Sequence, residues 1–280
     1  MLKKRIFWQH FMTAIAGAAS FATLVSFLFD CKPGSACWFW PILLTALIVI
    51  GCCVFAWWMC RSKSSVEIEI STNFTLTIEE GNLLDRELSG VIVIPVNTHF
   101  NPHSIGRRTS VFFQFVQTLW KERMNELDEK IHKALREAKD FIKAEDTDDS
   151  HGYNTEYKLG TCIEIMDGGN IYVLVAAAEK DQKMSSSLQK SDYPKVIEKL
   201  FEFLAGKHYQ KKIYLPLLGT GHRRLQKSYR RSLYFFLDAI EFKHSDLSFP
   251  DGVCLKLKSL QKSEINLTDV EHDFRLNIKG

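Results

Sequence analysis

A glycine turn, Gly219-Thr220-Gly221, follows an apolar run and leads into a basic stretch that begins with His222 and Arg223. Such a turn between a strand and a helix exposes backbone N–H groups beside the positive end of the helix, where they bind phosphate. Glycine allows the anion to approach because no Cβ stands in its way. We therefore predict that 219–223 binds phosphate, although an ordinary strand-to-helix turn would show the same pattern.

This segment departs from two well-known phosphate-binding motifs. It contains no Gly-Lys-Ser/Thr sequence, which excludes a Walker loop. Arg224 occupies the position where a Rossmann fingerprint has its third glycine. The predicted loop therefore belongs to neither of these nucleotide-binding classes.

Two asparagines stand where an α/β fold would offer further ligand contacts. Asn97 follows the β-branched run Val91–Val96, and ligands of open α/β sheets bind at the carboxyl ends of such strands. Its carboxamide could bond ribose hydroxyl groups or simply cap a turn. Asn82 and Leu83 form a turn just before the same run. Together with the glycine turn they make three candidate contacts for one nucleotide.

The sequence contains no recognisable catalytic or metal-binding set. His103, His222 and Glu79 are candidates for a general base, but none belongs to an evident pair or triad. The seven cysteines include no C-x-x-C pair, so the usual zinc and thioredoxin patterns are excluded. We predict no catalytic residue, no metal and no cofactor.

The segments that must position these residues alternate between strand-like and helix-like patterns. Strands are predicted at 66–70, 74–78, 91–96, 157–165, 171–177, 212–218 and 253–257. Helices are predicted at 109–142, as one helix or two, and at 192–204 and 229–240. The turn Asp167-Gly168-Gly169-Asn170 predicts a β-hairpin. This alternation predicts a three-layer α/β/α domain with a mixed, largely parallel sheet.

The first 65 residues differ from the rest in charge and hydropathy. They hold six basic residues and one acidic residue, a net charge of +5, and leave 30 basic and 32 acidic residues, or −2, in 66–280. Residues 11–29 and 38–59 contain no charge, and 19 helical residues span about 28 Å, close to the bilayer core. We predict a transmembrane hairpin at 1–60, a linker at 61–65 and a soluble domain at 66–280. That domain has no basic excess to indicate nucleic-acid binding.

The basic residues also predict the orientation of this hairpin. Lys3, Lys4 and Arg5 precede the first uncharged run, and Arg61 and Lys63 follow the second. Positive charge gathers on the cytoplasmic side, so both termini are expected in the cytoplasm and the hairpin in the cell (inner) membrane. A cleaved signal peptide would explain the first run but not the second.

The three candidate contacts resemble, in order, the motifs of a macro domain, the ADP-ribose-binding α/β/α module. That family has a Gly-Asp-Ile turn near adenine, an Asn-Ala-Ala-Asn strand end near the distal ribose and a Gly-x-Gly loop around the diphosphate. The matching residues here are Gly81-Asn82-Leu83, Pro95-Val96-Asn97 and Gly219-Thr220-Gly221. Asn82 replaces the usual Asp, and Thr98–Thr109, with Ser104 and Gly106, replaces a glycine-rich stretch. The resemblance implies that Ser104 and Gly106 also contact the ligand.

With the hairpin in front, the chain resembles the membrane-anchored macro-domain effector of type II Thoeris anti-phage defence. The resemblance implies a signal made from NAD by a TIR-domain partner, an ADP-ribose conjugated to histidine. The macro domain would sense it, the chain would assemble as a homo-oligomer, and the helices would damage the membrane.

Two other functions compete with this sensor. A membrane-anchored hydrolase of ADP-ribosyl groups or nucleotides would need a base, or a substrate-activated water, beside the distal ribose. A constitutive two-helix pore or scaffold would leave the three nucleotide-site features without a role. We therefore expect a binding module and not an enzyme.

Overall fold

The structure is a computed structural model. It describes residues 11–13, 16, 39–59, 63–103, 108–138, 141–144, 153–180, 186–207, 209–220, 228–244, 247–260 and 265–278. The chain divides into two units, Met1–Lys63 and Ser64–Gly280, and each is described by itself.

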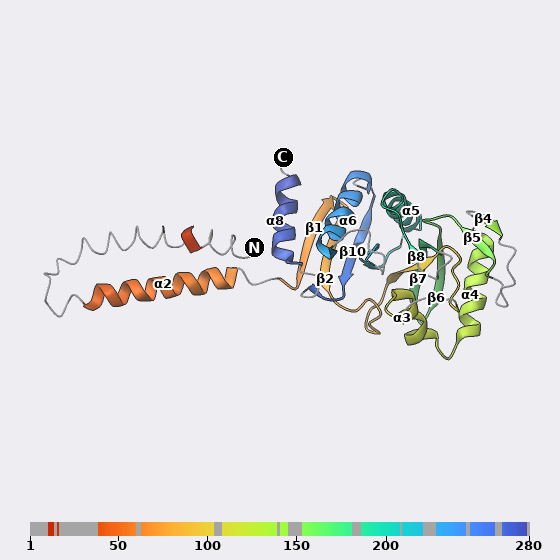
Figure 1. The fold of residues 1–280 in the computed structure, drawn as a ribbon, viewed down its shortest axis with the longest axis horizontal. Helices are drawn as coiled ribbons and strands as arrows, with labels where there is room; N and C mark the ends of the chain where they lie inside the picture. Colours follow the sequence, from red (N-terminus) through yellow and green to blue (C-terminus); the bar gives the residue numbers. More distant parts are fainter. Residues whose placement is uncertain are drawn as a thin grey trace. The chain divides into compact units, whose positions relative to one another are not determined.

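The described part of the first unit is mainly one helix, α2 (Phe39–Met59), of 21 residues (Figure 1). Its bounds agree with the uncharged run at 38–59, whereas most of the run at 11–29 lies outside the described residues. Among the described residues, no helix has both the length and the hydropathy that a membrane span needs. The hairpin therefore stays a prediction.

The second unit is built on a mixed β-sheet. Its strands lie in the order β1 (Ser65–Ser71), β2 (Phe74–Glu80), β10 (Phe249–Leu257), β9 (Ile213–Pro216), β3 (Val91–Asn97), β7 (Asn170–Lys180) and β6 (Cys162–Asp167). The neighbours from β2 to β7 run parallel, and β1 and β6 are antiparallel edge strands. A short strand, β8 (Ser186–Ser187), pairs with β7. The prediction of a mixed, largely parallel sheet is confirmed.

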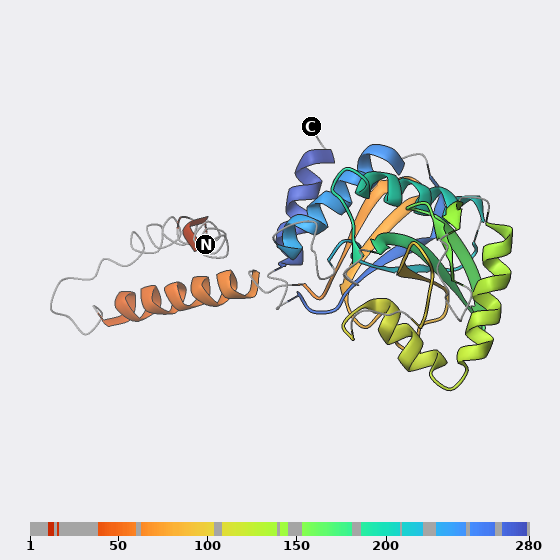
Figure 2. The same ribbon diagram turned by 45° about the vertical axis from the view of Figure 1, so that its right-hand side comes forward.

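Helices cover both faces of this sheet. Val91 and Val93 of β3 pack in a core with α5 (Tyr193–Gly206), α6 (Tyr229–His244) and α8 (Leu267–Ile278). Ile92 and Ile94 pack on the other face with α3 (Val111–Phe115), the π-helix η2 (Val116–Trp120) and α4 (Met124–Glu137). Figure 2 shows the two helical layers on opposite sides of the strands. Because both faces are buried, a continuous β-branched run is stable in β3, and the predicted three-layer fold is confirmed.

Several predicted boundaries are wrong. The region 109–142, predicted as one helix or two, is helical in separate segments, and its last helix, α4, ends at Glu137 and not at 142 because Ala138 takes an extended backbone conformation. The chain then forms β4 (Phe141–Ala144), which pairs with β5 (Thr155–Tyr157) in a separate two-stranded sheet. The predicted strand at 157–165 is likewise divided between β5 and β6, since Gly160 turns the chain between them with φ +85°. Helix α8 was not predicted.

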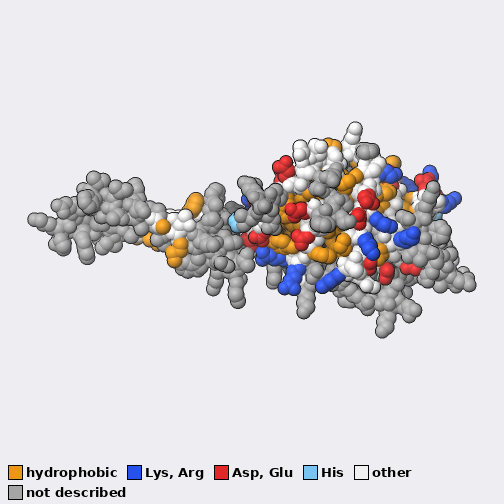
Figure 3. All heavy atoms as spheres, turned by 90° about the horizontal axis from the view of Figure 1, so that it is seen from above, with side chains coloured by type: hydrophobic (Ala, Val, Ile, Leu, Met, Phe, Trp, Pro, Cys, Tyr) orange, Lys and Arg blue, Asp and Glu red, His pale blue; other side chains and the backbone are white. Residues whose placement is uncertain are grey.

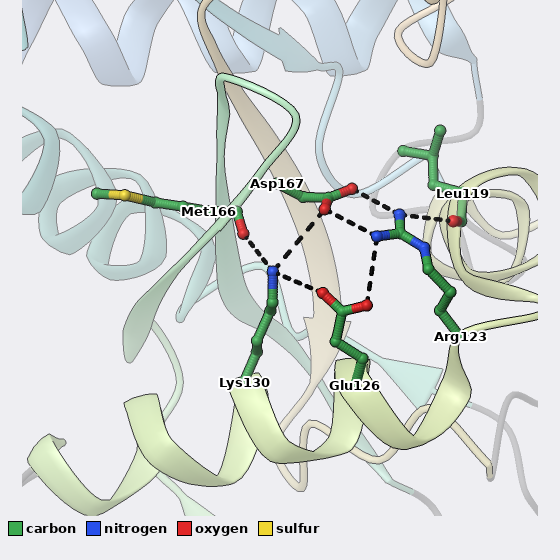
Figure 4. Close-up of polar contacts among 6 residues, drawn as sticks. All are labelled: Leu119, Arg123, Glu126, Lys130, Met166 and Asp167. Atoms are coloured by element: carbon green, nitrogen blue, oxygen red, sulfur yellow. Dashed lines mark hydrogen bonds and ion pairs between the residues drawn. The ribbon is translucent and has the colours of Figure 1, made fainter.

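The hairpin between β6 and β7 is confirmed, and charged contacts tie it to α4. Gly168 and Gly169 have φ of +57° and +84°, as a tight hairpin turn requires. Arg123 donates to both carboxylate oxygens of Asp167 over 3.0 and 2.7 Å (Figure 4). Lys130 donates to the carbonyl oxygen of Met166 over 2.7 Å. These contacts fasten the amino edge of the sheet, where β7 begins.

The indole ring of Trp120 lies beneath the same two cations. Trp120 is fully buried at the end of η2. The guanidinium carbon of Arg123 is 4.4 Å from its ring centre, and the Lys130 Nζ is 5.2 Å away. Such cation–π contacts add to the stabilisation that burial of the ring provides.

On the face that Figure 3 shows, basic and acidic side chains are interspersed over the second unit.

Candidate functional site

The central sheet opens between β3 and β9. These two strands pair only at Val91–Ile213 and Ile92–Tyr214, near their amino ends. On its other side, β3 stays paired with β7 as far as Asn97. The carboxyl ends of β3 and β9 therefore part from each other.

The opening is a topological switch point, because the connections that leave β3 and β9 lead to opposite sides of the sheet. From β3 the chain passes through α3, η2 and α4 toward β6 and β7 on one side. From β9 it passes through α6 to β10 on the other side, and α6 covers the opposite face. Ligands of open α/β sheets bind at such points, beyond the carboxyl ends of the strands. Asn97 ends β3 and Gly219 follows β9, so both flank this opening.

The sequence allowed Asn97 either to bind ribose or to cap a turn, and in the structure its side chain caps a turn. It is half-buried and follows a register shift between β3 and β7. Its Oδ1 accepts a hydrogen bond of 3.1 Å from the backbone N–H of His99, and its carbonyl accepts from Phe100. This turn fixes the carboxamide at the edge of the opening, and the contact with ribose stays a prediction.

The segment after Asn97 is held tightly in its first part. Thr98 donates to the carbonyl of Ala178 over 3.0 Å and accepts from the N–H of Tyr157 over 2.9 Å. Phe100 has φ +55°, is fully buried and meets the Tyr157 ring edge-on, with ring centres 5.5 Å apart. Ser104 and Gly106, which we predicted as ligand contacts, lie outside the described residues.

The turn after β2 is anchored to β10. The N–H of Gly81 donates to the carbonyl of Leu257 over 2.9 Å, and Asn82 Oδ1 accepts from the N–H of Leu84 over 3.2 Å. Asn82 is exposed, whereas the side chain of Leu83 is buried in the same core as Ile92. Of these two predicted contacts, Asn82 thus has the more accessible side chain.

The glycine turn after β9 is described only in part. Gly219 has φ +73°, which explains why glycine stands there. The hydroxyl of Thr220 donates to the carbonyl of Leu217 over 2.8 Å and closes the turn. Gly221, His222 and Arg223 lie outside the described residues, so the phosphate contact stays a prediction.

Glu79, one candidate base, is held in an ion pair. Lys256 Nζ lies 2.7 Å from its Oε1, and the Cys254 thiol donates to the same oxygen over 3.0 Å. Burial alone would raise the pKa of Glu79, but the hydrogen bonds from Lys256 and Cys254 outweigh it and lower the pKa. A carboxylate with a lowered pKa is a poor general base.

His103, another candidate base, has a partner that the sequence did not reveal. Its Nε2 lies 2.7 Å from Asp128 Oδ2, and the hydroxyl of Tyr153 donates to the other carboxylate oxygen over 2.8 Å. Our interpretation that His103 belongs to no pair is therefore wrong. Among the described residues, no cluster of His, Cys, Asp and Glu could hold a metal ion.

A protein-family model described as "Thoeris protein ThsA, Macro domain" matches residues 76–255. The chain belongs to this family. The match runs from β2 to β10 and so contains all three predicted ligand motifs. Family membership makes this a protein of Thoeris anti-phage defence, with a macro domain for a ligand of the ADP-ribose type.

Solved structures agree with this fold. The Oceanobacillus iheyensis macrodomain with ADP is similar at a TM-score of 0.51 and 13% identity, over 75% of this chain and 97% of that chain. A mutant of the same macrodomain with ADPR also gives 0.51 and 13%, over 75% and 99%. At this identity the likeness shows the fold alone. The chain matches none of the curated proteins compared with it.

Proposed function

We propose that this protein is a membrane-bound sensor and effector of bacterial anti-phage defence. Its macro domain binds an ADP-ribose-type signal, histidine-ADP-ribose made from NAD by a TIR-domain partner, in the opening between β3 and β9. The observation that carries the proposal is the early end of the β3–β9 pairing, with Asn97 and Gly219 flanking the gap. The family match supports the ligand class.

The N-terminal unit is the proposed effector. Two uncharged runs, 11–29 and 38–59, would form a hairpin in the inner membrane with both termini in the cytoplasm. Only five residues separate the end of α2 at Met59 from the start of β1 at Ser65. A change in how macro domains associate would therefore act on the helices through a short connection. In this proposal ligand binding favours a homo-oligomer, and assembly of the helices damages the membrane.

One observation favours a second function, hydrolysis of an ADP-ribosyl group. The His103–Asp128 pair follows β3 closely in the chain, and an aspartate that orients a histidine is a known arrangement for a general base. Against this, the other described candidate base, Glu79, is engaged by Lys256. We therefore favour binding without turnover.

Calorimetry of the full-length protein in detergent tests the ligand. ADP-ribose and histidine-ADP-ribose should bind, whereas NAD should bind more weakly. Chromatography of the same mixtures should recover the ligand unchanged after hours. Absence of binding to both nucleotides would refute the sensor, and steady release of a product that stops in His103→Ala would establish the hydrolase.

Particle size in detergent and dye leakage from liposomes test the effector role. Addition of histidine-ADP-ribose should enlarge the particle and release dye, because a ligand can drive assembly only by binding the assembled state more tightly. An unchanged particle and intact liposomes at saturating ligand would contradict this role while leaving the binding proposal in place.

A further inference from the structure

The chain enters the second unit at the carboxyl edge of the sheet, the same edge as the opening between β3 and β9. The strands β1, β2 and β10 lie side by side (Figure 1). β1 runs antiparallel to β2, with Ser65 opposite Glu79, so β1 begins where β2 ends. β2, β10, β9 and β3 are parallel to one another. The first residues of the unit therefore lie at the edge where the ligand is proposed to bind.

Hydrogen bonds join this entry point to the turn after β2. The N–H of Glu80 donates to the carbonyl of Ser64 over 3.2 Å, on the β1 side. The next N–H, of Gly81, donates to the carbonyl of Leu257 over 2.9 Å, on the β10 side. Gly81 and Asn82 belong to the predicted ligand turn. A single residue, Glu80, therefore connects that turn to the last residue before β1.

An ion pair supports the same turn from below. Lys256 Nζ lies 2.7 Å from Glu79 Oε1, and only 12% of the Lys256 side chain is exposed. A Cβ placed on Gly81 would lie 3.2 Å from the Lys256 Nζ, so the lysine packs directly against the glycine. The end of β2, the end of β10 and the start of the turn are thus held together by backbone and side-chain contacts.

The entry point itself is held more weakly than the rest of β1. Ser64 and Ser65 are exposed, whereas Val66 and Ile68 are buried in the core that contains α8. β1 is also an edge strand of the described sheet. Exposed backbone hydrogen bonds with few buried contacts open locally at a far lower cost than unfolding. We therefore expect the Glu80–Ser64 bond to be the first of this strand to open, and the one that a ligand at the next residue can bias.

We propose that the turn Glu80–Leu83 couples ligand binding to the linker and acts as a switch. A nucleotide held by Gly81 and Asn82 restrains the turn and keeps the Glu80–Ser64 bond closed. The linker then leaves the sheet in one direction. The inference rests on the proposed function and names the contact through which its ligand would reach the membrane helices.

The short connection makes this direction matter. Five residues separate α2 from β1, and they span at most about 18 Å when fully extended. A fixed direction at Ser64 therefore limits how the helices can meet those of a second copy. The ligand favours the assembled state because that state requires the closed bond, and a ligand shifts an equilibrium only by binding one state more tightly.

Glu80→Pro tests the coupling in the full-length protein, with histidine-ADP-ribose as the probe. Proline removes the N–H that bonds Ser64, and the extended residue before it suits proline. The Kd, measured in detergent at protein concentrations too low for assembly, should stay within about threefold of the parent's value. The ligand concentration for half-maximal particle growth and dye release should rise about tenfold or more. Glu80→Ala is the matched control, because it removes the exposed side chain and keeps the N–H.

A lengthened linker tests the same coupling with every residue of the second unit in place. Insertion of Gly-Ser-Gly-Ser between Lys63 and Ser64 lets the junction bond form but makes the connection to α2 slack. Ligand binding should persist, and particle growth and dye release should again need about tenfold more ligand or more. The same insertion between Gly168 and Gly169, where a side chain would meet open space, is the control and should behave as the parent does.

Three results would overturn the coupling proposal. They are assembly of Glu80→Pro or of the lengthened linker at the parent's ligand concentration, an equal loss of assembly in Glu80→Ala, and a loss of binding together with assembly in Glu80→Pro. A parent that binds no ligand, or binds it without assembly, is a different failure, because it removes the proposed function itself. Circular dichroism verifies the fold of each variant, and the lengthened linker decides alone if Glu80→Pro does not fold.

Discussion

The amino and carboxyl edges of the central sheet are held together in different ways. At the amino edge, Arg123 clamps the β6–β7 turn through both oxygens of Asp167, and the buried ring of Trp120 lies beneath it. At the carboxyl edge, β3 and β9 separate, and single hydrogen bonds such as Asn97–His99 shape the turns. The carboxyl edge also has an ion pair, between Lys256 of β10 and Glu79 of β2, but it opens between β3 and β9, whereas the amino edge is fastened at the β6–β7 turn by charge and packing.

This difference suggests that stability and binding are properties of opposite edges. Side chains at the amino edge contact each other, so their removal should lower the free energy of unfolding. The opening at the carboxyl edge is the proposed ligand site, because ligands of open α/β sheets bind beyond the carboxyl ends of the strands. Variants at one edge should therefore leave the property of the other edge unchanged, which the following predictions test.

The largest effect is expected for Trp120→Ala. Removal of a fully buried indole leaves a cavity and ends two cation–π contacts, so the free energy of unfolding should fall by about 3–5 kcal/mol. Urea denaturation followed by far-UV circular dichroism measures it. Lys121→Ala, at the adjacent exposed position, should be nearly neutral. A loss of ADP-ribose affinity in the folded fraction of Trp120→Ala would contradict the hypothesis that stability depends on the amino edge and binding on the carboxyl edge.

Gly221→Glu should affect binding and not stability. The new carboxylate would fill the predicted approach to the diphosphate with like charge, and affinity for ADP-ribose should fall about 100-fold or more. Gly206→Glu is the matched control, because it adds the same side chain at a glycine with open space around it. If Gly221→Glu binds like this control, the glycine turn does not hold the phosphates.

Features that depend on neighbouring residues could be predicted from the sequence. The run Val91–Val96 indicated a strand buried on both faces, and its side chains do alternate between the two cores. The Asp167–Asn170 turn indicated a hairpin, and its two glycines have the positive φ that this requires. In both cases the pattern and the structure that it specifies lie within a few residues.

Features that depend on distant residues could not be predicted. The His103–Asp128 pair joins residues 25 positions apart, and the parting of β3 from β9 depends on the register of the whole sheet. Helix α8 is different, because a signal was present. Leu267, Val270 and Phe274 are spaced as on one helical face, and all three are buried in the core.

A smaller effect is expected when Arg123 is replaced by lysine. Lysine keeps the positive charge but cannot bind both oxygens of Asp167 in a planar fork, so the melting temperature should fall by less than in Trp120→Ala. Arg231→Lys, at an exposed position on α6, is the control and should leave the melting temperature unchanged. Equal melting temperatures for the two variants would mean that charge alone fastens the amino edge. Ligand affinity should be that of the parent in both.

The smallest effect concerns the pH dependence of the same contact. The hydrogen bond from Arg123 lowers the pKa of Asp167 below its ordinary value of 3.8. A carboxyl with a lowered pKa in the folded state stabilises the protein above its unfolded pKa, and this contribution is lost as the pH falls through the folded value. Asp167→Asn should therefore be less stable than the parent at pH 7, by up to about 1 kcal/mol because Arg123 is partly exposed.

The difference between Asp167→Asn and the parent should shrink as the pH falls below about 4, because Asp167 is protonated first in the unfolded chain and, at lower pH, in the folded parent. Urea denaturation of both proteins between pH 7 and pH 3 measures it. Glu122→Gln, at an exposed position near Arg123, controls for the general effect of removing one acid. If the difference in free energy of unfolding stays constant across this range, the Arg123–Asp167 contact stabilises the fold by packing and hydrogen bonding alone. The amino edge would then owe its stability to the buried ring of Trp120 and not to the charge on Asp167.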